Sequence, residues 1–577
     1  MRLRDSSSFL RLLQFTVQRT VYLETFGCQM NELDSELVAG QLRALGYRFT
    51  PERDSADVVL YNTCSVREHA EQKVWSRLGE LTDRKKEEPG LVVGVLGCLA
   101  ERDGADLMKR MPVVDVMVGP GELDKLPGLL DNAVRTRAAM LADGVDAGRG
   151  VPRSAGQAAL QGNTSRRSGT LAAAADTLEM LDLSRAVSPL DESGPKRSAY
   201  VRITRGCNKF CTYCVVPFTR GAEVHRPPEH IIEECKRLAD AGVLEITLLG
   251  QTVNHYRFEH GAAVSVGGIT QPQKGRSYAG GHRRDPFAGA NVTTFADLLQ
   301  RIHDEVPTIA RLRFVTSYPR DFGDDVLEVI RDHPRLCRYL HVPAQSGSDR
   351  ILGMMNRGYA VGEYLEFLDR ARGFLHQPES GRPCEVSGDF IVGFPTETDA
   401  DFAATMALTR KAQYKNAFIF KYSPRPGTTA HERLTDDVPE AVKRRRNNEL
   451  LALQAEISQT VASSYVGRTV DVFVEGFSSH ERKRRSAGPT RDEHSRGDRG
   501  IGLTVNGRSI GHGSACAIDD EAEPAPPARE AQFVGRTDTD MIVVFDAPRD
   551  ENSLAGSMVR VRIDEARALS LAGERVA

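Results

Sequence analysis

Three closely spaced cysteines have a pattern that suits metal chemistry. Cys207, Cys211 and Cys214 fall within eight positions, in the stretch RGCNKFCTYCVVPFTRG at 205–221. A structural zinc site is usually closed by four ligands, whereas three thiolates can each bind one iron of a cubane cluster and leave the fourth iron open. An open metal position is where a small molecule can be activated. The spacing therefore predicts a catalytic cluster, and a zinc site completed by His225 is the alternative.

Three further cysteines are far apart in the sequence but share a local setting. Cys28, Cys64 and Cys98 each follow a short apolar run of strand length and stand in a turn of glycine and polar residues. The carboxyl ends of parallel strands face one edge of a sheet, where ligands bind. We therefore expect these thiolates to converge on a second three-cysteine cluster with one open iron. Buried cysteines with a purely structural role are the alternative.

The N-terminal cysteines lie in a region where strand and helix patterns alternate. Apolar runs at 21–28, 58–64 and 91–98 are separated by helical patterns. Strand, helix and strand at this spacing imply a parallel sheet. We expect an α/β domain at 21–135, after an N-terminal extension at 1–20.

The middle of the chain predicts a second α/β domain. The segment at 136–195 is rich in Gly, Ser and Ala and is interpreted as a flexible linker. Repeated βα units at 196–440 predict a whole or partial TIM-like barrel, interrupted by a Gly-rich surface insert at 257–291. The expected strands are the runs at 199–207, 245–251, 311–317, 338–345, 386–394 and 418–423.

The C-terminal part changes from helix to strand. A charged helix is expected at 441–465, and a small β-rich domain at 466–577. A polar stretch at 480–530 splits this domain and has the composition of a disordered insert.

The ordered motifs of the chain resemble those of the radical S-adenosylmethionine methylthiotransferase family, and most closely its MiaB type, which acts on tRNA. The resemblance runs from about Val21 to Glu574 apart from the inserts, and the C-terminal domain is similar to the RNA-binding TRAM barrel through VGRT…VVF and SLAGE. The other matching motifs are GCQMN, NTCSVREHAEQK, LGCLAER, RGCNKFCTYCVVPFTRG, LLGQTVN, HVPAQSGS, DFIVGFPTET and YSPRPGT.

The resemblance implies an enzyme with two 4Fe-4S clusters and S-adenosylmethionine. Cys207, Cys211 and Cys214 would hold the cluster at which one electron cleaves S-adenosylmethionine to a 5′-deoxyadenosyl radical. Cys28, Cys64 and Cys98 would hold an auxiliary cluster whose sulfur is methylated. The implied reaction delivers a methylthio group to C2 of N6-isopentenyladenosine at position 37 of tRNA, next to the anticodon.

The residues around the first cysteines favour this substrate over two related ones. The stretches CQMN and NTCSVRE resemble the group that acts on isopentenylated adenosine. Sister groups act on threonylcarbamoylated tRNA and on a ribosomal protein, and usually carry other residues after the first cysteine. Both remain alternatives, as does a noncatalytic protein that binds zinc and RNA.

Other side chains are expected around the cofactor and the RNA. Polar residues at strand ends face the barrel mouth, where catalytic residues collect. The expected cofactor-binding residues are Tyr213, which lies between two cluster cysteines, with Gln251, Asn254, Gln345 and Asp389. Basic side chains around the cluster loop, and one in the tail, are expected to contact tRNA phosphates. They are Arg205, Lys209, Arg220, Arg226 and Arg536.

The composition limits the remaining partners. A net charge of -3 gives no global attraction to nucleic acid, so RNA affinity must come from local basic patches. The sequence has no apolar run long enough to span a bilayer, and no membrane partner is expected. We expect a monomer in the cytoplasm, or in an organelle if the N-terminus belongs to a transit peptide. It would work with an electron donor and a sulfur donor.

Overall fold

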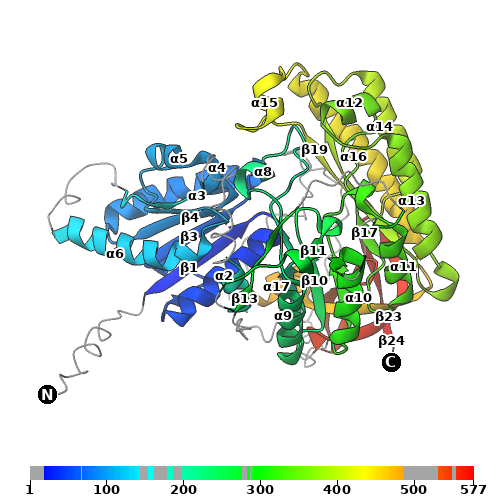
Figure 1. The fold of residues 1–577 in the computed structure, drawn as a ribbon, viewed down its shortest axis with the longest axis horizontal. Helices are drawn as coiled ribbons and strands as arrows, with labels where there is room; N and C mark the ends of the chain where they lie inside the picture. The colour runs from blue at the N-terminus through cyan, green and yellow to red at the C-terminus, as the bar shows by residue number, and fades with distance from the viewer. Residues whose placement is uncertain are drawn as a thin grey trace, which may run out of the picture. The chain divides into compact units, whose positions relative to one another are not determined.

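A six-stranded sheet forms the N-terminal part of the chain in the computed structural model (Figure 1). Its order is β2-β1-β3-β4-β5-β6, and every neighbouring pair is parallel. The three strands predicted here are confirmed, together with their parallel arrangement. The strands are β1 (Thr20–Phe26), β2 (Arg48–Phe49), β3 (Val58–Thr63), β4 (Val92–Gly97), β5 (Val116–Val118) and β6 (Gln157–Ala159).

The structure describes most of the chain, with gaps. The described residues are 19–65, 68–142, 154–161, 178–185, 197–266, 268–275, 283–285, 289, 291–486, 530–548 and 554–576. Most of the expected N-terminal extension, and most of the insert expected at 480–530, lie outside these ranges. Among the described residues, no helix combines the length and the apolar character needed to cross a membrane.

Helices cover both faces of the N-terminal sheet because its central strands are apolar on both sides. Strand β3 is buried throughout, and its alternate side chains enter two separate cores. Val58 and Leu60 lie in one core, and Val59 and Tyr61 lie in the other. The first core is completed by α2 (Gln29–Ala44) and α6 (Leu126–Ala142), and the second by α3 (Glu68–Glu87) and α5 (Ala105–Arg110).

The segment expected as a flexible linker contains ordered elements where the structure describes it. Helix α6 continues to Ala142, and β6 adds a strand to the sheet. The Ala155 N–H donates to the buried Asp115 carboxylate at 2.9 Å, which fixes the chain beside β5. A helical stretch at 178–183 supplies Glu179 and Asp182 to buried ion pairs. The short helix at 178–183 coincides with the run TLEMLDL, where the sequence allows one short helix, whereas composition missed β6 because it has only three residues.

Six parallel strands in the middle of the chain form the expected partial barrel. One sheet has the order β16-β10-β7 and another the order β17-β18-β19, and a parallel bridge between Leu312 and Leu336 joins them. All six strands coincide with the apolar runs in the sequence. They are β7 (Ser198–Arg202), β10 (Glu245–Leu249), β16 (Arg311–Phe314), β17 (Tyr339–His341), β18 (Glu385–Val392) and β19 (Asn416–Lys421).

One face of these strands packs against a layer of helices, several of which run side by side in Figure 1. Apolar side chains from strands and helices form one continuous core. The helices are α9 (Pro228–Asp240), α10 (Phe295–Glu305), α11 (Asp324–Asp332), α13 (Val361–Leu375), α14 (Asp399–Ala412) and α16 (Glu440–Ser463). Helix α16 matches the connecting helix expected at 441–465.

The described parts of the 257–291 insert form short antiparallel pairs. Strand β11 (Arg257–Glu259) pairs with β15 (Val292–Thr294), and β12 (Ser265–Val266) pairs with β13 (Ile269–Thr270). A further strand of the insert, β14 (Gln273–Lys274), pairs with β9 (Val224–His225), which follows the cysteine loop. The insert therefore lies beside that loop.

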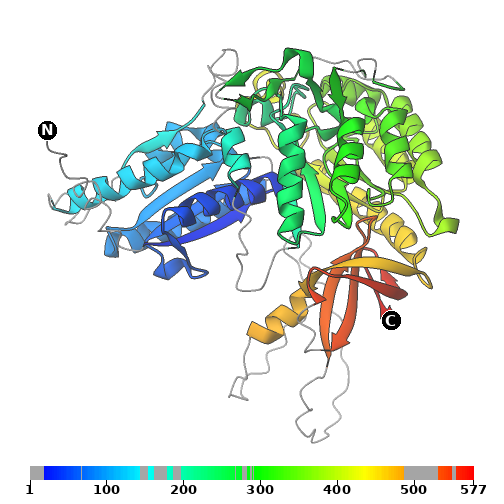
Figure 2. The same cartoon turned by 60° about the horizontal axis from the view of Figure 1, so that its bottom comes forward.

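A separate C-terminal unit, within Tyr465–Thr537 and Met541–Ala577, is a closed five-stranded barrel (Figure 2). Its order is β20-β21-β22-β24-β23, and β23 pairs with β20 to close it. Alternate side chains of β21 and β22, including Phe533 and Phe545, are buried inside. The small β-barrel is thus confirmed. Its strands are β20 (Thr469–Phe477), β21 (Glu530–Arg536), β22 (Ile542–Pro548), β23 (Met558–Arg567) and β24 (Ser570–Val576).

Candidate functional site

The three N-terminal cysteines stand at the carboxyl ends of three adjacent strands. Cys28 directly precedes α2, Cys64 follows β3, and Cys98 opens the helix α4 (Cys98–Asp103). Because β1, β3 and β4 are neighbours in a parallel sheet, these ends share one edge. The fold therefore gathers three thiols from distant parts of the sequence.

Two glycines permit this close approach. Gly27 and Gly97 precede Cys28 and Cys98, and their φ angles are 151° and 88°. A Cβ on Gly27 would lie 2.7 Å from the Cβ of Cys64, and one on Gly97 would lie 2.4 Å from the Asn62 side-chain oxygen. Any other residue would push the strand ends apart, because glycine alone lacks the Cβ.

The surroundings of these thiols shift the pKa values of Cys28 and Cys98 in opposite directions. A hydrogen bond with Cys64 is the main cause that lowers the pKa of Cys28 to about 6, helped by the Arg220 charge and by backbone N–H groups at the start of α2. Burial raises the pKa of Cys98, and Arg220 opposes this rise. This lowered pKa favours the thiolate of Cys28, which is the form that binds metal.

The other three cysteines lie on a single loop that folds back on itself. The loop follows β8 (Thr204–Arg205) and leads into the short helix α8 (Val216–Thr219). The Cys207 N–H donates to the Gly221 carbonyl at 3.2 Å, and the Cys214 N–H donates to the Cys211 carbonyl at 3.0 Å. These bonds hold the three side chains in one small region.

One cation reaches this loop from elsewhere in the barrel. Arg357 Nη1 donates to Cys211 Sγ at 3.4 Å. Burial raises the pKa of Cys207 to about 11 and also raises that of Cys214. A metal centre, with Arg357 beside it, would supply the positive charge that these buried thiolates require.

The separation of the thiols distinguishes a cluster from a single zinc ion. With Zn–S bonds of about 2.3 Å, tetrahedral sulfur ligands lie about 3.8 Å apart. In the described part of the chain, two groups of His, Cys, Asp or Glu have ligand atoms that all lie within 4.8 Å of one another, and neither contains a cysteine. In a cubane each thiolate binds its own iron, so the thiolates stand further apart. Both sets offer three thiolate donors, as a cubane with one open iron requires, and neither is drawn together as tightly as a tetrahedral zinc site. His225 lies with Glu223 and His255 instead.

Helix α8 connects the two cysteine sets. It begins just after Cys214, and Thr219 at its end hydrogen-bonds the Cys98 side chain. The next residue, Arg220, donates from Nη2 to the Asp34 carboxylate on α2 at 2.8 Å. The cysteine loop of the barrel is thus joined directly to the cysteine edge of the N-terminal sheet.

Known proteins match the chain in both of these regions. Residues 20–119 match the family described as Uncharacterized protein family UPF0004, and residues 201–409 match the Radical SAM superfamily. The tRNA-2-methylthio-N(6)-dimethylallyladenosine synthase of Rhodopirellula baltica is 39% identical over 558 residues, which cover 97% of this chain and 96% of the relative. This chain belongs to the tRNA-2-methylthio-N(6)-dimethylallyladenosine synthase family.

Other members of the synthase family match to a similar extent. The synthase of Phocaeicola vulgatus is 35% identical over 559 residues, again 97% of this chain and 96% of the relative. Among solved structures, the radical S-adenosylmethionine methyltransferase TsrM of Kitasatospora setae has a TM-score of 0.44 and 13% identity, and the match covers 72% of this chain and 74% of that chain.

The residues expected to bind cofactor occupy different settings in this synthase-family chain. Tyr213 packs against a small apolar cluster that contains Met355 and Phe394. The Asn254 side chain makes two hydrogen bonds with the Tyr318 backbone. Its Nδ2 donates to the Tyr318 carbonyl at 2.8 Å, and its Oδ1 accepts from the Tyr318 N–H at 2.9 Å. Its amide therefore holds a neighbouring loop in place.

Two more of these residues follow strands of the barrel, whereas Asp389 lies within β18 and not at its end. Gln251 lies just beyond β10 and is partly exposed. Gln345 is buried with a positive φ of 70°, and its N–H donates to the Asp389 carbonyl at 2.7 Å. The Asp389 carboxylate accepts from His341 Nε2 at 3.0 Å. A positive φ outside glycine is costly and tends to occur at functional sites.

The basic residues expected to contact tRNA phosphates are mostly buried in ion pairs with carboxylates of the protein. Arg205 and Arg226 both pair with Glu179, each at 2.9 Å, and Arg226 has no exposed side-chain surface. Lys209 pairs with Asp321 at 2.6 Å and Arg220 with Asp34 at 2.8 Å. These cations stabilise the cysteine loop from within. Arg536 differs, because its side chain is 35% exposed beside Glu475.

Three residues near this synthase-family site have roles that the sequence did not indicate, because Arg357 and Asp34 were not singled out and Arg220 was expected at tRNA phosphate. Arg357 contacts Cys211 and lies over the Tyr318 and Tyr359 rings, at 4.7 and 5.1 Å from their centroids. Asp34 and Arg220 form the connection between the cysteine sets. Only the folded chain brings these residues together, because their partners are distant in sequence.

Proposed function

We propose that this chain adds a methylthio group to C2 of N6-isopentenyladenosine at position 37 of tRNA. The observation that carries the proposal is the pair of three-cysteine sets, joined through Thr219 and Arg220. Membership of the synthase family, with relatives matched over nearly their whole length, supports the substrate.

We assign Cys207, Cys211 and Cys214 to the cluster that binds S-adenosylmethionine, and the N-terminal set to the auxiliary cluster. When bound, these groups would supply a radical that abstracts the C2 hydrogen and the methylated sulfur that replaces it. A side-chain base could not remove the C2 hydrogen, because that hydrogen is not acidic. Arg357 and Arg220 each place a positive charge beside one cysteine set. The burial of Cys207 and Cys98 keeps bulk water away from the thiolates.

We propose the face of β18 and β19 opposite the helices as the platform for the modified base. Phe418 and Phe420 stand opposite Asp389 and Ile391 on this face and are 44% and 39% exposed. Ile419, between them, points the other way and packs against the helix-covered core. Aromatic faces stack on nucleobases, and stacking is worth about 1–3 kcal/mol per base. Two exposed aromatic rings on a strand of the active domain suit an adenine with an apolar isopentenyl group.

The remaining partners follow from this chemistry. Radical formation requires an external electron donor, and repeated turnover requires a sulfur donor. We further propose that the chain acts as a monomer in the cytoplasm, and that Arg536 on the barrel contacts tRNA phosphate. Binding of tRNA should then weaken as the salt concentration rises.

The test is anaerobic reconstitution of iron and sulfide, followed by mass spectrometry of nucleosides after reaction with three substrates. These are tRNA with isopentenyladenosine, tRNA with threonylcarbamoyladenosine, and ribosomal protein. We expect a methylthio product from the first alone. Product from either of the others would assign the chain to a sister group, and zinc in place of iron in the cysteine sets would support a noncatalytic RNA-binding protein.

A further inference from the structure

A second group of metal-ligating side chains lies beside the cysteine loop. Glu223 Oε1 is 2.7 Å from His255 Nδ1 and 3.8 Å from His225 Nε2. One donor atom from each residue lies within 4.8 Å of the other two. All three side chains are buried, with exposures of 1%, 5% and 3%. None of them belongs to either cysteine set.

The backbone holds these side chains in place before any ligand arrives. His225 is on β9, which pairs on one side with β8, directly ahead of Cys207, and on the other with β14 of the insert. His255 ends the short helix η5 (Val253–His255), which follows β10 of the barrel. The group therefore joins two separate segments, and the insert lies beside it. A Cβ on Gly275 would lie 2.8 Å from His225 Nε2, so the insert approaches the group closely.

The donor set and its spacing suit a cation of the zinc type. Two imidazoles and one carboxylate form a common ligand set for zinc and related first-row metals. With metal–nitrogen bonds of about 2.0–2.1 Å, tetrahedral donors lie about 3.3 Å apart. The two measured separations, 2.7 and 3.8 Å, lie on either side of that value.

Buried atoms on Glu223 and His225 have no hydrogen-bond partner among the described residues. They are Glu223 Oε2 and His225 Nδ1. These are the second donor atoms of the two side chains, so the hydrogen bond between Glu223 and His255 leaves part of the group unsatisfied.

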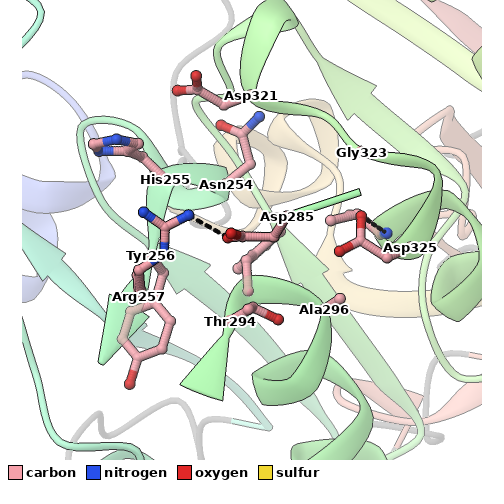
Figure 3. A pocket seen from close by; sticks show the side chains of 12 residues that line it. Asn254, His255, Tyr256, Arg257, Asp285, Thr294, Ala296, Asp321, Gly323 and Asp325 are labelled. Carbon is pink, nitrogen blue, oxygen red and sulfur yellow. Dashed lines mark hydrogen bonds and ion pairs between the residues drawn. The ribbon is translucent and has the colours of Figure 1, made fainter. Parts of the chain in front are cut away.

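The surroundings leave room for one more ligand. A cavity of about 280 Å³ adjoins both histidines, and Glu259, Gln273 and Lys274 also line it. On the other side, Figure 3 shows His255 close to Asn254 in a neighbouring pocket, where Arg257 is held by an ion pair with Asp285. The positive charge of Arg257 is thereby balanced by a carboxylate next to the group.

We propose that Glu223, His225 and His255 bind one divalent cation of the zinc type, at a site distinct from both cysteine sets and with its fourth position open to the cavity. The cation ties η5 to β9, which itself pairs with the strand ahead of Cys207 and with β14 of the insert. This inference concerns residues outside both clusters, so it stands or fails independently of the methylthiolation reaction.

Metal content of the cluster-loaded full-length protein gives the first test. The protein is equilibrated with excess zinc chloride, passed through a desalting column, and analysed for zinc and iron per chain. We expect about one zinc in the wild type and at least a tenfold loss in His225→Gln and His255→Gln, with iron unchanged. The matched control is His333→Gln, which alters the partly exposed group of His303, Asp304 and His333 and should keep the zinc.

Unchanged iron in the variants shows that they are folded and loaded. Wild-type protein without zinc would mean that the group is only a hydrogen-bonded cluster and would overturn the proposal. Retention of zinc in His225→Gln, or its loss in His333→Gln, would overturn it as well.

X-ray absorption at the zinc edge gives a second test that does not depend on variants. We expect a first shell of nitrogen and oxygen at about 2.0–2.2 Å. Sulfur at about 2.3 Å would place the zinc in a cysteine set and would contradict the proposal.

Discussion

The Arg220 guanidinium lies 2.8 Å from the Asp34 carboxylate, and this ion pair ties the two cysteine sets together. Asp34 is on α2, which begins just after Cys28, and Arg220 follows α8, which begins just after Cys214. Both side chains are almost fully buried. The protein itself therefore fixes the position of one set relative to the other.

Replacement of Arg220 by Gln should loosen this connection. Asp34 would keep its second partner, Arg202, at 3.0 Å, so we expect a loss of about 2–3 kcal/mol, less than the 3–5 kcal/mol typical for breaking a buried pair. Urea unfolding of the cluster-free protein measures this change. The control is Arg284→Gln, which removes an exposed pair with Glu328 and should cost less than about 1 kcal/mol. Equal losses in both variants would show that the buried pair has no special role.

Cys28 and Cys207, one from each cysteine set, should differ in their reactivity toward an alkylating agent. In cluster-free protein, Cys28 should be modified with a midpoint near pH 6, because its pKa is lowered to about 6. Cys207 should react only well above pH 9, because burial raises its pKa to about 11. Mass spectrometry of the peptides after iodoacetamide treatment at graded pH gives both midpoints. Equal midpoints would contradict the charge arrangement around the thiols.

The same shift predicts how Cys28 affects stability. Its folded pKa lies below its ordinary value of 9.0, so the folded state binds fewer protons than the unfolded state between these values. Its contribution to the free energy of unfolding is complete above pH 9 and fades as the pH falls to about 6. In Cys28→Ala this part of the pH dependence should be missing.

The sequence predicted the strands and the gathering of the cysteines, because both follow from local rules. Apolar runs mark buried strands, and parallel strand ends share an edge, so Cys28, Cys64 and Cys98 could be placed without a structure. The burial of Arg205 and Arg226 in ion pairs could not be predicted in this way. Their partner Glu179 lies 26 and 47 residues upstream, in a segment whose composition resembles a linker. A basic stretch looks the same in sequence whether it faces solvent or a buried carboxylate.

Arg226 provides a direct test of this difference. After its replacement by Gln, Glu179 keeps Arg205 and Glu234 keeps Arg185, so we expect a loss of about 2–3 kcal/mol of stability, less than the 3–5 kcal/mol typical for breaking a buried pair. The effect of this replacement on the salt dependence of tRNA binding should be negligible. If the slope of the logarithm of the tRNA binding constant against the logarithm of the salt concentration became less steep by about one, Arg226 would instead contact a phosphate. Filter binding at several salt concentrations measures the slope, with Arg536→Gln as the variant expected to lower it.

The aromatic pair on β19 should govern use of the modified base. Phe418→Ala and Phe420→Ala each remove a stacking surface, and we expect a loss of about 5- to 150-fold in kcat/KM for isopentenylated tRNA, equivalent to 1–3 kcal/mol. Leu569→Ala is the control, because Leu569 is 69% exposed and lies on the separate C-terminal barrel. Iron content and formation of 5′-deoxyadenosine should be unchanged in both Phe variants. Normal kcat/KM in both would rule out this face as the base platform.

The last prediction concerns the division of labour between the two cysteine sets. Cys211 shares one loop with the other thiols assigned to the S-adenosylmethionine cluster, whereas Cys64 belongs to the N-terminal sheet. Radical formation needs an electron at the first cluster and does not need the second. Cys64→Ala should therefore still cleave S-adenosylmethionine to 5′-deoxyadenosine but form no methylthio product, and Cys211→Ala should lose both activities.

Iron content should fall by about half in each variant, because both clusters carry the same number of irons. The decisive measurement is 5′-deoxyadenosine and modified nucleoside from the same reaction. Cys235→Ala is a matched control, because this buried thiol lies in the apolar core of the barrel. It should retain both products and its full iron content. Full methylthiolation by Cys64→Ala would show that the N-terminal cysteines are structural, and the assignment of two clusters would then have to be abandoned.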